Sequence, residues 1–288
     1  MPDSTIDACL PVRRPSIGAV PPYVQPMLLI EIQAALAGAM VETRYQPVVR
    51  LADRVPVSLE ALVRLNHPAR GTLLPETFVP QIEDAGLTGQ LTDLVVACAF
   101  ADMTGTALAP PQSPLGGLSV SLNFPLDVLV GTTALAQLET RRQAAGIPVE
   151  QVVIELTESQ PVGDLVALRG AVERLRRTGY QIVIDDVSPA VVGLDRLLDL
   201  PFTGIKLDQH LVYLLTTDPK AVTEVERVIR IARRRDLTVV AEGVETAALW
   251  HQLTALGADQ AQGFLISHAL PAAAVPAWRK SWQELPHF

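Results

Sequence analysis

The segment QVVIELTESQPVGDLVALRGAVERLRRTGYQIVIDD, residues 151–186, contains one complete strand–helix–strand unit. Its first run, QVVIE, and its last, YQIVIDD, are short, apolar and rich in β-branched residues. The stretch between them has the apolar spacing of an amphipathic helix that ends at Gly179. Strands buried on both faces are continuous apolar runs, so Glu155, Asp185 and Asp186, which close these runs, are expected at strand ends.

The same pattern recurs along most of the chain. Apolar runs also close on Glu60, Asn123, Lys206 and Glu242, and from Asn123 onward the polar ends follow at steps of 32, 30, 21 and 36 residues. Such steps suit one strand plus one returning helix. Earlier, RYQPVVRL and VPVSLEALVRL are joined by ADR, which predicts a hairpin. We therefore expect a TIM-like (β/α)8 barrel with an antiparallel first strand, whose strand ends meet at one mouth.

The composition fits one globular barrel domain. The chain has 288 residues, and barrels of this class run to about 250 residues as one domain. We expect a flexible proline-rich extension at 1–25 and the barrel at 26–288. A net charge of −8 argues against binding of a nucleic-acid polymer, and no apolar run is long enough for a membrane span. Two cysteines, Cys9 and Cys98, suit a reducing compartment, so a cytoplasmic location is expected.

Hard oxygen ligands dominate the predicted mouth. Glu, Asn and Asp side chains favour Mg²⁺ or Mn²⁺ over zinc, and the five histidines have no zinc-site spacing. The adjacent carboxylates of Asp185 and Asp186 repel each other unless cations lie between them. Two ions about 3.5–4 Å apart can activate water and hold a phosphoryl oxygen. A helix-capping aspartate beside a surface aspartate is the alternative for this pair, but the matching groups on the other strand ends favour a metal site.

Short motifs support a specific resemblance. Around EALVR (60–64) stand YQPVV (45–49), HPARGTLLPETFVP (67–80), VSLN (120–123), IELTES (154–159), IDD (184–186), IKLD (205–208), AEGVET (241–246) and DQAQGFLIS (259–267). In this order, over about residues 42–275, the chain resembles the EAL-domain cyclic-di-GMP phosphodiesterases. The resemblance implies a TIM-like barrel with an antiparallel first strand. It also implies cyclic di-GMP as the ligand, hydrolysis of one phosphodiester to linear pGpG, and Mg²⁺ or Mn²⁺ as cofactor.

The resemblance also assigns roles to residues. The metal ligands are Glu60, Asn123, Glu155 and Asp185, with Asp186 serving the second ion. Lys206 resembles the catalytic lysine that orients the attacking water or steadies developing negative charge, and Glu242 resembles the glutamate of the metal site and general base. The remaining positions are substrate contacts at Gln46, Leu62, Arg64 and Gln262, with Arg64 toward a phosphate, and a loop-bracing pair at Glu158 and Glu245.

Asn123 is assigned with a departure from the family pattern. The family usually reads N-x-S, whereas this chain reads Asn123-Phe124-Pro125. The step of 32 residues to Glu155 places Asn123 on the family asparagine without a gap. Ser121 shares its strand face but comes two residues early, so Asn123 is preferred.

The loop after the two aspartates departs further. The family usually reads DDFGTGYSSL, and this chain reads DDVSPAVVGL from residue 185. Pro189 fixes its backbone φ where glycines would allow tight turns, so the loop is expected to follow another path. In the family this loop helps to hold metal and forms the dimer face. A homodimer is therefore one prediction for this chain, and a monomer is the alternative. Two hypotheses result: a phosphodiesterase, or an EAL-like receptor that binds cyclic di-GMP with little turnover.

Overall fold

The computed structural model describes residues 27, 29–37, 40–105, 118–157, 165–187 and 197–285. The predicted extension at 1–25 and the altered loop beyond Val187 lie outside these residues, so the domain boundary stays a prediction. No helix within the described ranges combines the length and the apolar character that a bilayer crossing needs.

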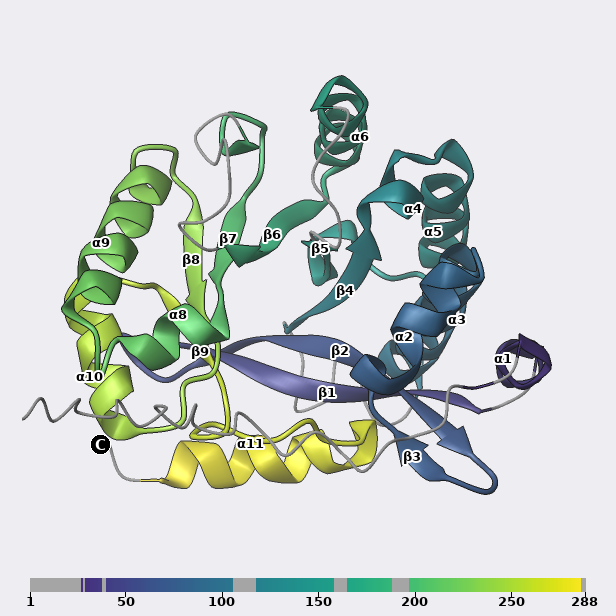
Figure 1. Cartoon of the computed structure of the whole chain (residues 1–288), viewed down its shortest axis with the longest axis horizontal. Helices are drawn as coiled ribbons and strands as arrows, with labels where there is room; N and C mark the ends of the chain where they lie inside the picture. The colour runs from purple at the N-terminus through teal and green to yellow at the C-terminus, as the bar shows by residue number, and fades with distance from the viewer. Residues whose placement is uncertain are drawn as a thin grey trace, which may run out of the picture.

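The strands form a closed barrel (Figure 1). Their order is β1-β9-β8-β7-β6-β5-β4-β2-β3, and β1 also pairs with β2, which closes the ring. β1 is antiparallel to β2 and β9, whereas β2 and β4 through β9 are parallel along the ring. The predicted barrel with an antiparallel first strand is therefore confirmed. The strands are β1 (Val41–Arg50), β2 (Pro56–His67), β3 (Gly71–Leu73), β4 (Ser119–Pro125), β5 (Val152–Thr157), β6 (Gln181–Val187), β7 (Gly204–Leu207), β8 (Thr238–Ala241) and β9 (Gln260–Gln262).

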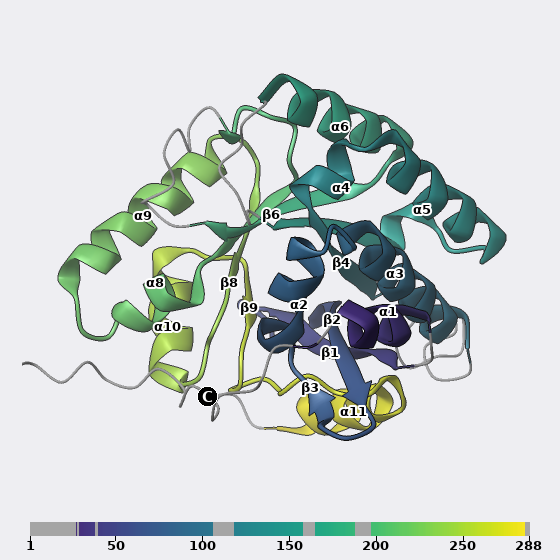
Figure 2. The ribbon, with the colours of Figure 1, turned by 45° about the vertical axis from the view of Figure 1, so that its right-hand side comes forward.

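Helices cover the outside of the barrel (Figure 2). Gly146, Gly179 and Gly257 have φ of 65°, 107° and 90°, so they are the left-handed residues expected after helices α5, α6 and α10. The helices are α1 (Leu29–Ala37), α2 (Pro75–Asp84), α3 (Thr88–Thr104), α4 (Leu126–Val130), α5 (Thr132–Ala144), η1 (Val149–Gln151), α6 (Leu165–Thr178), α8 (Gln209–Leu214), α9 (Pro219–Arg233), α10 (Ala247–Leu256), η2 (Ala272–Ala274) and α11 (Val275–Glu284).

The first strand is anchored by a buried polar contact. Tyr45 on β1 is fully buried, and its hydroxyl donates to Asp102 Oδ2 on α3 at 2.7 Å. Thr43 Oγ1 donates to the same carboxylate oxygen at 3.0 Å. Burial raises the pKa of Tyr45, so its hydroxyl keeps its proton and stays a donor. The contact ties β1 to the helical layer one residue before Gln46.

One expected strand end is wrong. Glu60 lies in the middle of β2 and not at its end, because β2 continues to His67. The extra length pairs with β1, where Leu65 faces Val41, and with β3, where Leu65 faces Leu73. The hairpin ladders therefore prolong the strand beyond the residues that line the barrel interior.

Candidate active site

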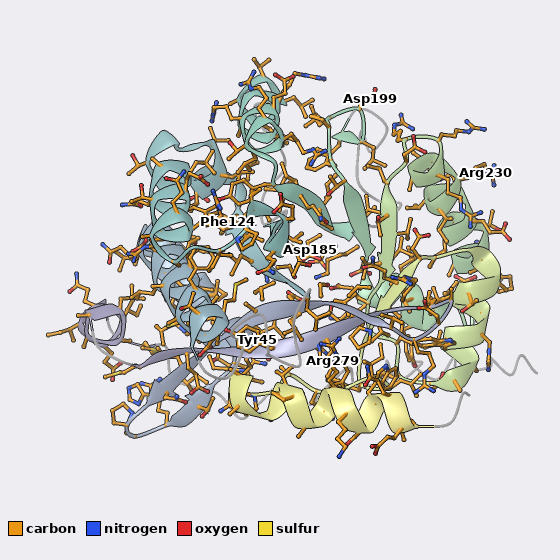
Figure 3. All side chains as sticks on the ribbon, turned by 180° about the vertical axis from the view of Figure 1, so that it is seen from behind. Tyr45, Phe124, Asp185, Asp199, Arg230 and Arg279 are labelled. Atoms are coloured by element: carbon orange, nitrogen blue, oxygen red, sulfur yellow. The ribbon has the colours of Figure 1, made fainter. Side chains whose placement is uncertain are left out.

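A buried lysine lies among four carboxylates inside the barrel. Lys206 on β7 is 1% exposed. Its Nζ lies 2.6 Å from Glu242 Oε1, 3.0 Å from Glu155 Oε2, 3.1 Å from Asp185 Oδ1 and 3.2 Å from Glu60 Oε2. Asp185 is labelled in the interior of the barrel in Figure 3. Strands far apart in the sequence thus bring five of the predicted residues together.

Parallel pairing sets the heights of these side chains in the barrel. Glu60 on β2 pairs with Ser121 on β4, and Asn123 two residues further along β4 pairs with Glu155 on β5. Residues two apart on a strand share one face, so Asn123 and Ser121 both face inward at different heights. Asn123 is the one that reaches Glu60, because its Nδ2 donates to Glu60 Oε1 at 2.8 Å.

A backbone irregularity places the second aspartate. Adjacent residues of a regular strand point to opposite faces, so Asp185 and Asp186 should not serve one site. The pairing of β6 with β7 shifts between Ile184 and Val187, and Asp186 has a left-handed φ of 53°. Ligand oxygens of Asp185, Asp186 and Glu242 consequently lie within 4.8 Å of one another. A left-handed non-glycine residue costs about 1–3 kcal/mol, a strain that is typical of functional sites.

The cluster carries more negative charge than one ammonium can balance. Burial raises the pKa of Glu155 to about 8, and burial followed by repulsion from Asp185 raises the pKa of Asp186 to about 6. Burial also raises the pKa of Asp185 and of Glu242. For Glu60 burial acts in the same direction, but the Lys206 ammonium and two side-chain amides outweigh it and lower the pKa. A site of this kind needs protons or added cations to offset its charge.

The oxygen atoms of the cluster fit a divalent ion. Oxygens of Glu60, Glu155 and Asp185 lie within 4.8 Å of one another, which forms a second acidic group that shares Asp185 with the first. Asn123 Oδ1 is buried and has no hydrogen-bond partner among the described residues. A buried polar atom normally has a partner, and a hard cation is a suitable one for this amide oxygen.

Two glutamines line the same wall. Gln262 on β9 donates through Nε2 to Glu60 Oε2 at 2.6 Å and to Gln46 Oε1 at 3.0 Å. Gln46 on β1 donates in turn to the Ser267 carbonyl at 3.1 Å. Gln262 Oε1 is buried without a hydrogen-bond partner in the described part of the chain. The two glutamines therefore connect the antiparallel strand to the acidic cluster.

The other predicted positions lie apart from the cluster. Leu62 and Arg64 follow Glu60 at alternate positions of β2, so they share its strand face beyond the cluster. The guanidinium of Arg64 is half-buried and donates to the Val63 carbonyl at 2.8 Å. Glu245 is exposed, and its predicted bracing partner Glu158 lies outside the described residues, so their contact stays a prediction.

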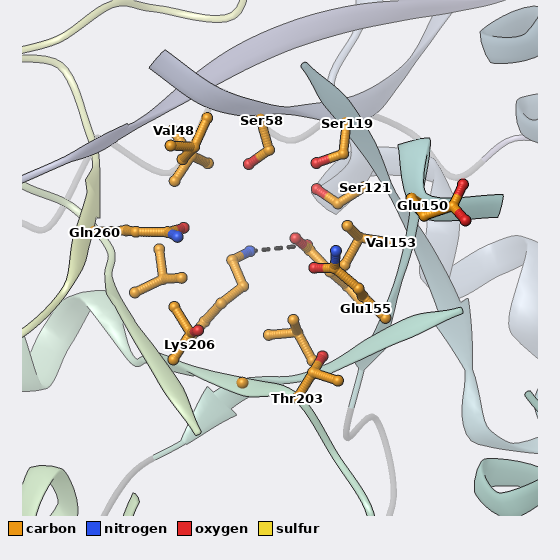
Figure 4. Close-up of a pocket in the computed structure, with 16 residues that line it drawn as sticks. Val48, Ser58, Ser119, Ser121, Glu150, Val153, Glu155, Thr203, Lys206 and Gln260 are labelled. Carbon is orange, nitrogen blue, oxygen red and sulfur yellow. Dashed lines mark hydrogen bonds and ion pairs between the residues drawn. The ribbon is translucent and has the colours of Figure 1, made fainter. Parts of the chain in front are cut away.

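A cavity below the cluster was not predicted. It has a volume of about 270 Å³ and opens toward the N-terminal ends of the strands. Ser58, Ser119 and Ser121 line one wall, and Lys206 and Glu155 also line it (Figure 4). Branched apolar side chains usually fill a barrel interior, so Ser119 and Ser121 at alternate positions of β4, with Ser58 paired to Ser119 on β2, were the available sequence signal.

Comparison with known proteins follows this geometry. Residues 30–269 match the EAL domain. The chain belongs to the EAL domain family. It is 30% identical over 253 residues to "Cyclic di-GMP phosphodiesterase NbdA" of Pseudomonas aeruginosa. The aligned region covers 88% of this chain and 32% of the relative. It is 31% identical over 234 residues to "Cyclic di-GMP phosphodiesterase PA2567" of the same species, which covers 81% of this chain and 39% of the relative.

A solved structure of the family is also similar. "PaMucR Phosphodiesterase, c-di-GMP complex" has a TM-score of 0.77 and 27% identity, over 86% of this chain and 98% of that chain. This EAL-family chain spans between about a third and two fifths of the length of the two curated relatives. The predicted family and fold are thus confirmed.

Proposed function

We propose that this EAL domain is a divalent-metal-dependent phosphodiesterase that hydrolyses cyclic di-GMP to linear pGpG. The observation that carries the proposal is the cluster of Glu60, Glu155, Asp185 and Glu242 around Lys206. Beside it lies Asn123 Oδ1, which has no hydrogen-bond partner in the described part of the chain. Two relatives are named cyclic di-GMP phosphodiesterases, and a similar structure is a complex with that dinucleotide.

The metal ligands proposed are four carboxylates of the two acidic groups, together with the amide oxygen of Asn123. Glu60, Asn123, Glu155 and Asp185 would hold one Mg²⁺ or Mn²⁺, and Asp186 would join Asp185 on the second. When bound, such ions acidify a water molecule and stabilise negative charge on phosphoryl oxygens. Asp185 belongs to both acidic groups, so its two carboxylate oxygens can serve two neighbouring ions.

Glu242 would act on the proton of the attacking water, and Lys206 on the negative charge that develops on the phosphoryl group. The carboxylate of Glu242, whose pKa burial raises, would accept the proton of the attacking water. The water oxygen bonds to phosphorus and the bond to the 3′-oxygen breaks. The 3′-oxygen then takes a proton from solvent, which leaves a 5′-phosphate and a free 3′-hydroxyl. The ammonium of Lys206, 2.6 Å from Glu242, would orient the water and offset charge on the phosphoryl group.

The substrate contacts proposed lie around this centre. Gln262 is held in place by Glu60 and Gln46, and no donor among the described residues reaches its buried Oε1. Leu62 would pack against the dinucleotide. Arg64 would bind a phosphate, because a planar guanidinium matches phosphate oxygens in a two-point contact.

Incubation with substrate tests the proposal directly. The purified chain is incubated with cyclic di-GMP and either Mg²⁺ or Mn²⁺, and the products are separated by chromatography. We expect pGpG with metal and none in excess EDTA. Tight binding in calorimetry without any product would instead support the receptor alternative, which the altered sequence at 187–190 favours. A homodimer and a cytoplasmic location stay predictions from the sequence.

A further inference from the structure

The antiparallel strand β1 carries a row of polar side chains beside the site. Its register with β2 places Gln46 opposite Glu60, Arg44 opposite Leu62, and Glu42 opposite Arg64. Side chains directly opposite each other on paired strands share one face of the sheet and lie close together. Each proposed site residue on this part of β2 therefore has a polar neighbour on β1. Two of these neighbours, Glu42 and Arg44, have no part in the proposed function.

The alternation along β1 shows which way this row points. Thr43 and Tyr45 face outward, because their hydroxyls donate to Asp102 Oδ2 on the covering helix α3 at 3.0 Å and 2.7 Å. Adjacent residues of a strand point to opposite faces, so Glu42 and Arg44 face inward. Their side chains are 33% and 32% exposed, and this end of β1 lies beside the C-terminal part of β2, at the mouth of the barrel. Both charged groups are therefore open to a ligand in the mouth.

The guanidinium of Arg44 is held by its neighbour on the same face. Its Nε donates to Glu42 Oε1 at 2.8 Å, and its Nη2 lies 2.8 Å from the same oxygen. Neither contact uses Nη1, and neither uses Oε2 of the carboxylate. A planar guanidinium with a fixed orientation can present its remaining donors together to one pair of acceptors.

The surroundings of Arg44 combine positive charge with apolar surface. Burial lowers the pKa of Arg64, and the charge of Arg44 acts in the same direction, so the two guanidiniums lie near each other. Arg64 is the residue proposed for a phosphate. Leu62, directly opposite Arg44, supplies an apolar side chain that the face of an aromatic base can cover and a phosphate cannot. These neighbours favour the edge of a base, and not a second phosphate, as the partner of Arg44.

We propose that Arg44, positioned by Glu42, recognises a guanine base of the dinucleotide by donating to its O6 and N7 atoms, while the face of that base packs against Leu62. This inference rests on the proposed function and adds base specificity to it. The planar donors of arginine match the spacing of these two guanine acceptors. Adenine has an amino donor in place of O6, so the same guanidinium would disfavour it.

A ligand analogue tests the contact at a single atom. The 7-deaza analogue of cyclic di-GMP has carbon in place of N7, so it lacks one of the two proposed acceptors. Binding of both ligands is measured by calorimetry in excess EDTA, where the proposed mechanism allows no turnover. Wild type should bind the analogue about fivefold more weakly than cyclic di-GMP, because one hydrogen bond to a charged donor is lost.

Variants on β1 complete the test. Arg44→Ala should bind cyclic di-GMP at least about tenfold more weakly than wild type and should bind both ligands equally. It should melt at the wild-type temperature, because an exposed ion pair contributes little to stability. Glu42→Gln, which keeps the shape but removes the charge, should reduce the preference for cyclic di-GMP over the analogue. Arg50→Ala is the matched control, because Arg50 is an exposed, ion-paired arginine at the other end of the same strand.

The outcomes separate this inference from the proposed function. If wild type binds no cyclic di-GMP, the proposed function is wrong and this inference falls with it. If wild type binds cyclic di-GMP and Arg44→Ala retains the full preference over the analogue, recognition of guanine by Arg44 is overturned while the proposed function stands. Equal binding of the two ligands by wild type would overturn it as well, and weaker binding of both by Arg44→Ala would then assign a phosphate contact to Arg44. An unchanged preference in Glu42→Gln would overturn the positioning role of Glu42.

Discussion

Replacement of Glu60 by glutamine is the sharpest test of the metal mechanism. The two carboxylate oxygens of Glu60 accept from three donors: Asn123 Nδ2 at 2.8 Å, Gln262 Nε2 at 2.6 Å and Lys206 Nζ at 3.2 Å. Glutamine has nearly the same shape, but its amide offers one oxygen only. Its NH₂ group must face at least one of these donors, so the substitution removes a charge and creates a donor–donor conflict.

The expected loss follows from the position of Glu60. It is one of three carboxylates in the acidic group that would hold one ion, so its charge and one hard ligand disappear together. A correctly held ion is worth several kcal/mol of transition-state stabilisation, and a loss of about 4 kcal/mol corresponds to about a thousandfold in kcat/KM. We therefore expect the kcat/KM of Glu60→Gln to be about a thousandfold lower than that of wild type, and Mn²⁺ to bind more weakly.

The assay is initial-rate hydrolysis of cyclic di-GMP, followed by chromatographic separation of pGpG over a series of Mn²⁺ concentrations. Circular dichroism checks that the variant is folded. Glu226→Gln is the matched control, because Glu226 is an exposed glutamate on α9. A kcat/KM of Glu60→Gln within about threefold of wild type at saturating Mn²⁺ would refute the reasoning, as would turnover in excess EDTA.

Three further predictions concern the same site. Lys206→Ala should lower kcat at least about tenfold while calorimetry shows cyclic di-GMP binding largely intact, because the ammonium acts mainly on transition-state charge; equal losses would make it a binding residue. Without metal, the free energy of unfolding, measured by chemical denaturation, should fall as pH rises from 4.5 to about 8. The reason is that folded Glu155 keeps a proton that the unfolded chain has lost in this range. Added Mn²⁺ should make the free energy of unfolding depend less on pH. Grafting FGTG onto 187–190 should raise the hydrolysis rate and lower the Mg²⁺ needed for half-maximal activity; if neither changes in a rate titration, the loop is a neutral variant.

The sequence by itself determined the architecture. Each strand–helix step is a local pattern of apolar spacing and glycine caps, and such patterns depend on neighbouring residues only. The order of the barrel strands and the hairpin at the start could therefore be predicted from the sequence. The polar residues that close these runs also identified most of the acidic cluster. Strands of one parallel ring bring their ends to the same mouth, whatever the sequence between them.

Only the tertiary structure decided how these residues meet. The length of β2 beyond Glu60 depends on pairing with β1 and β3, and the left-handed Asp186 depends on a register shift against β7. Neither feature is a property of the local sequence. The four carboxylates around Lys206 lie on strands or directly after one, and they are up to 182 residues apart, between Glu60 and Glu242. The ion pairs of one ammonium with four carboxylates, and the cavity on the N-terminal side of the cluster, exist only once the ring has closed.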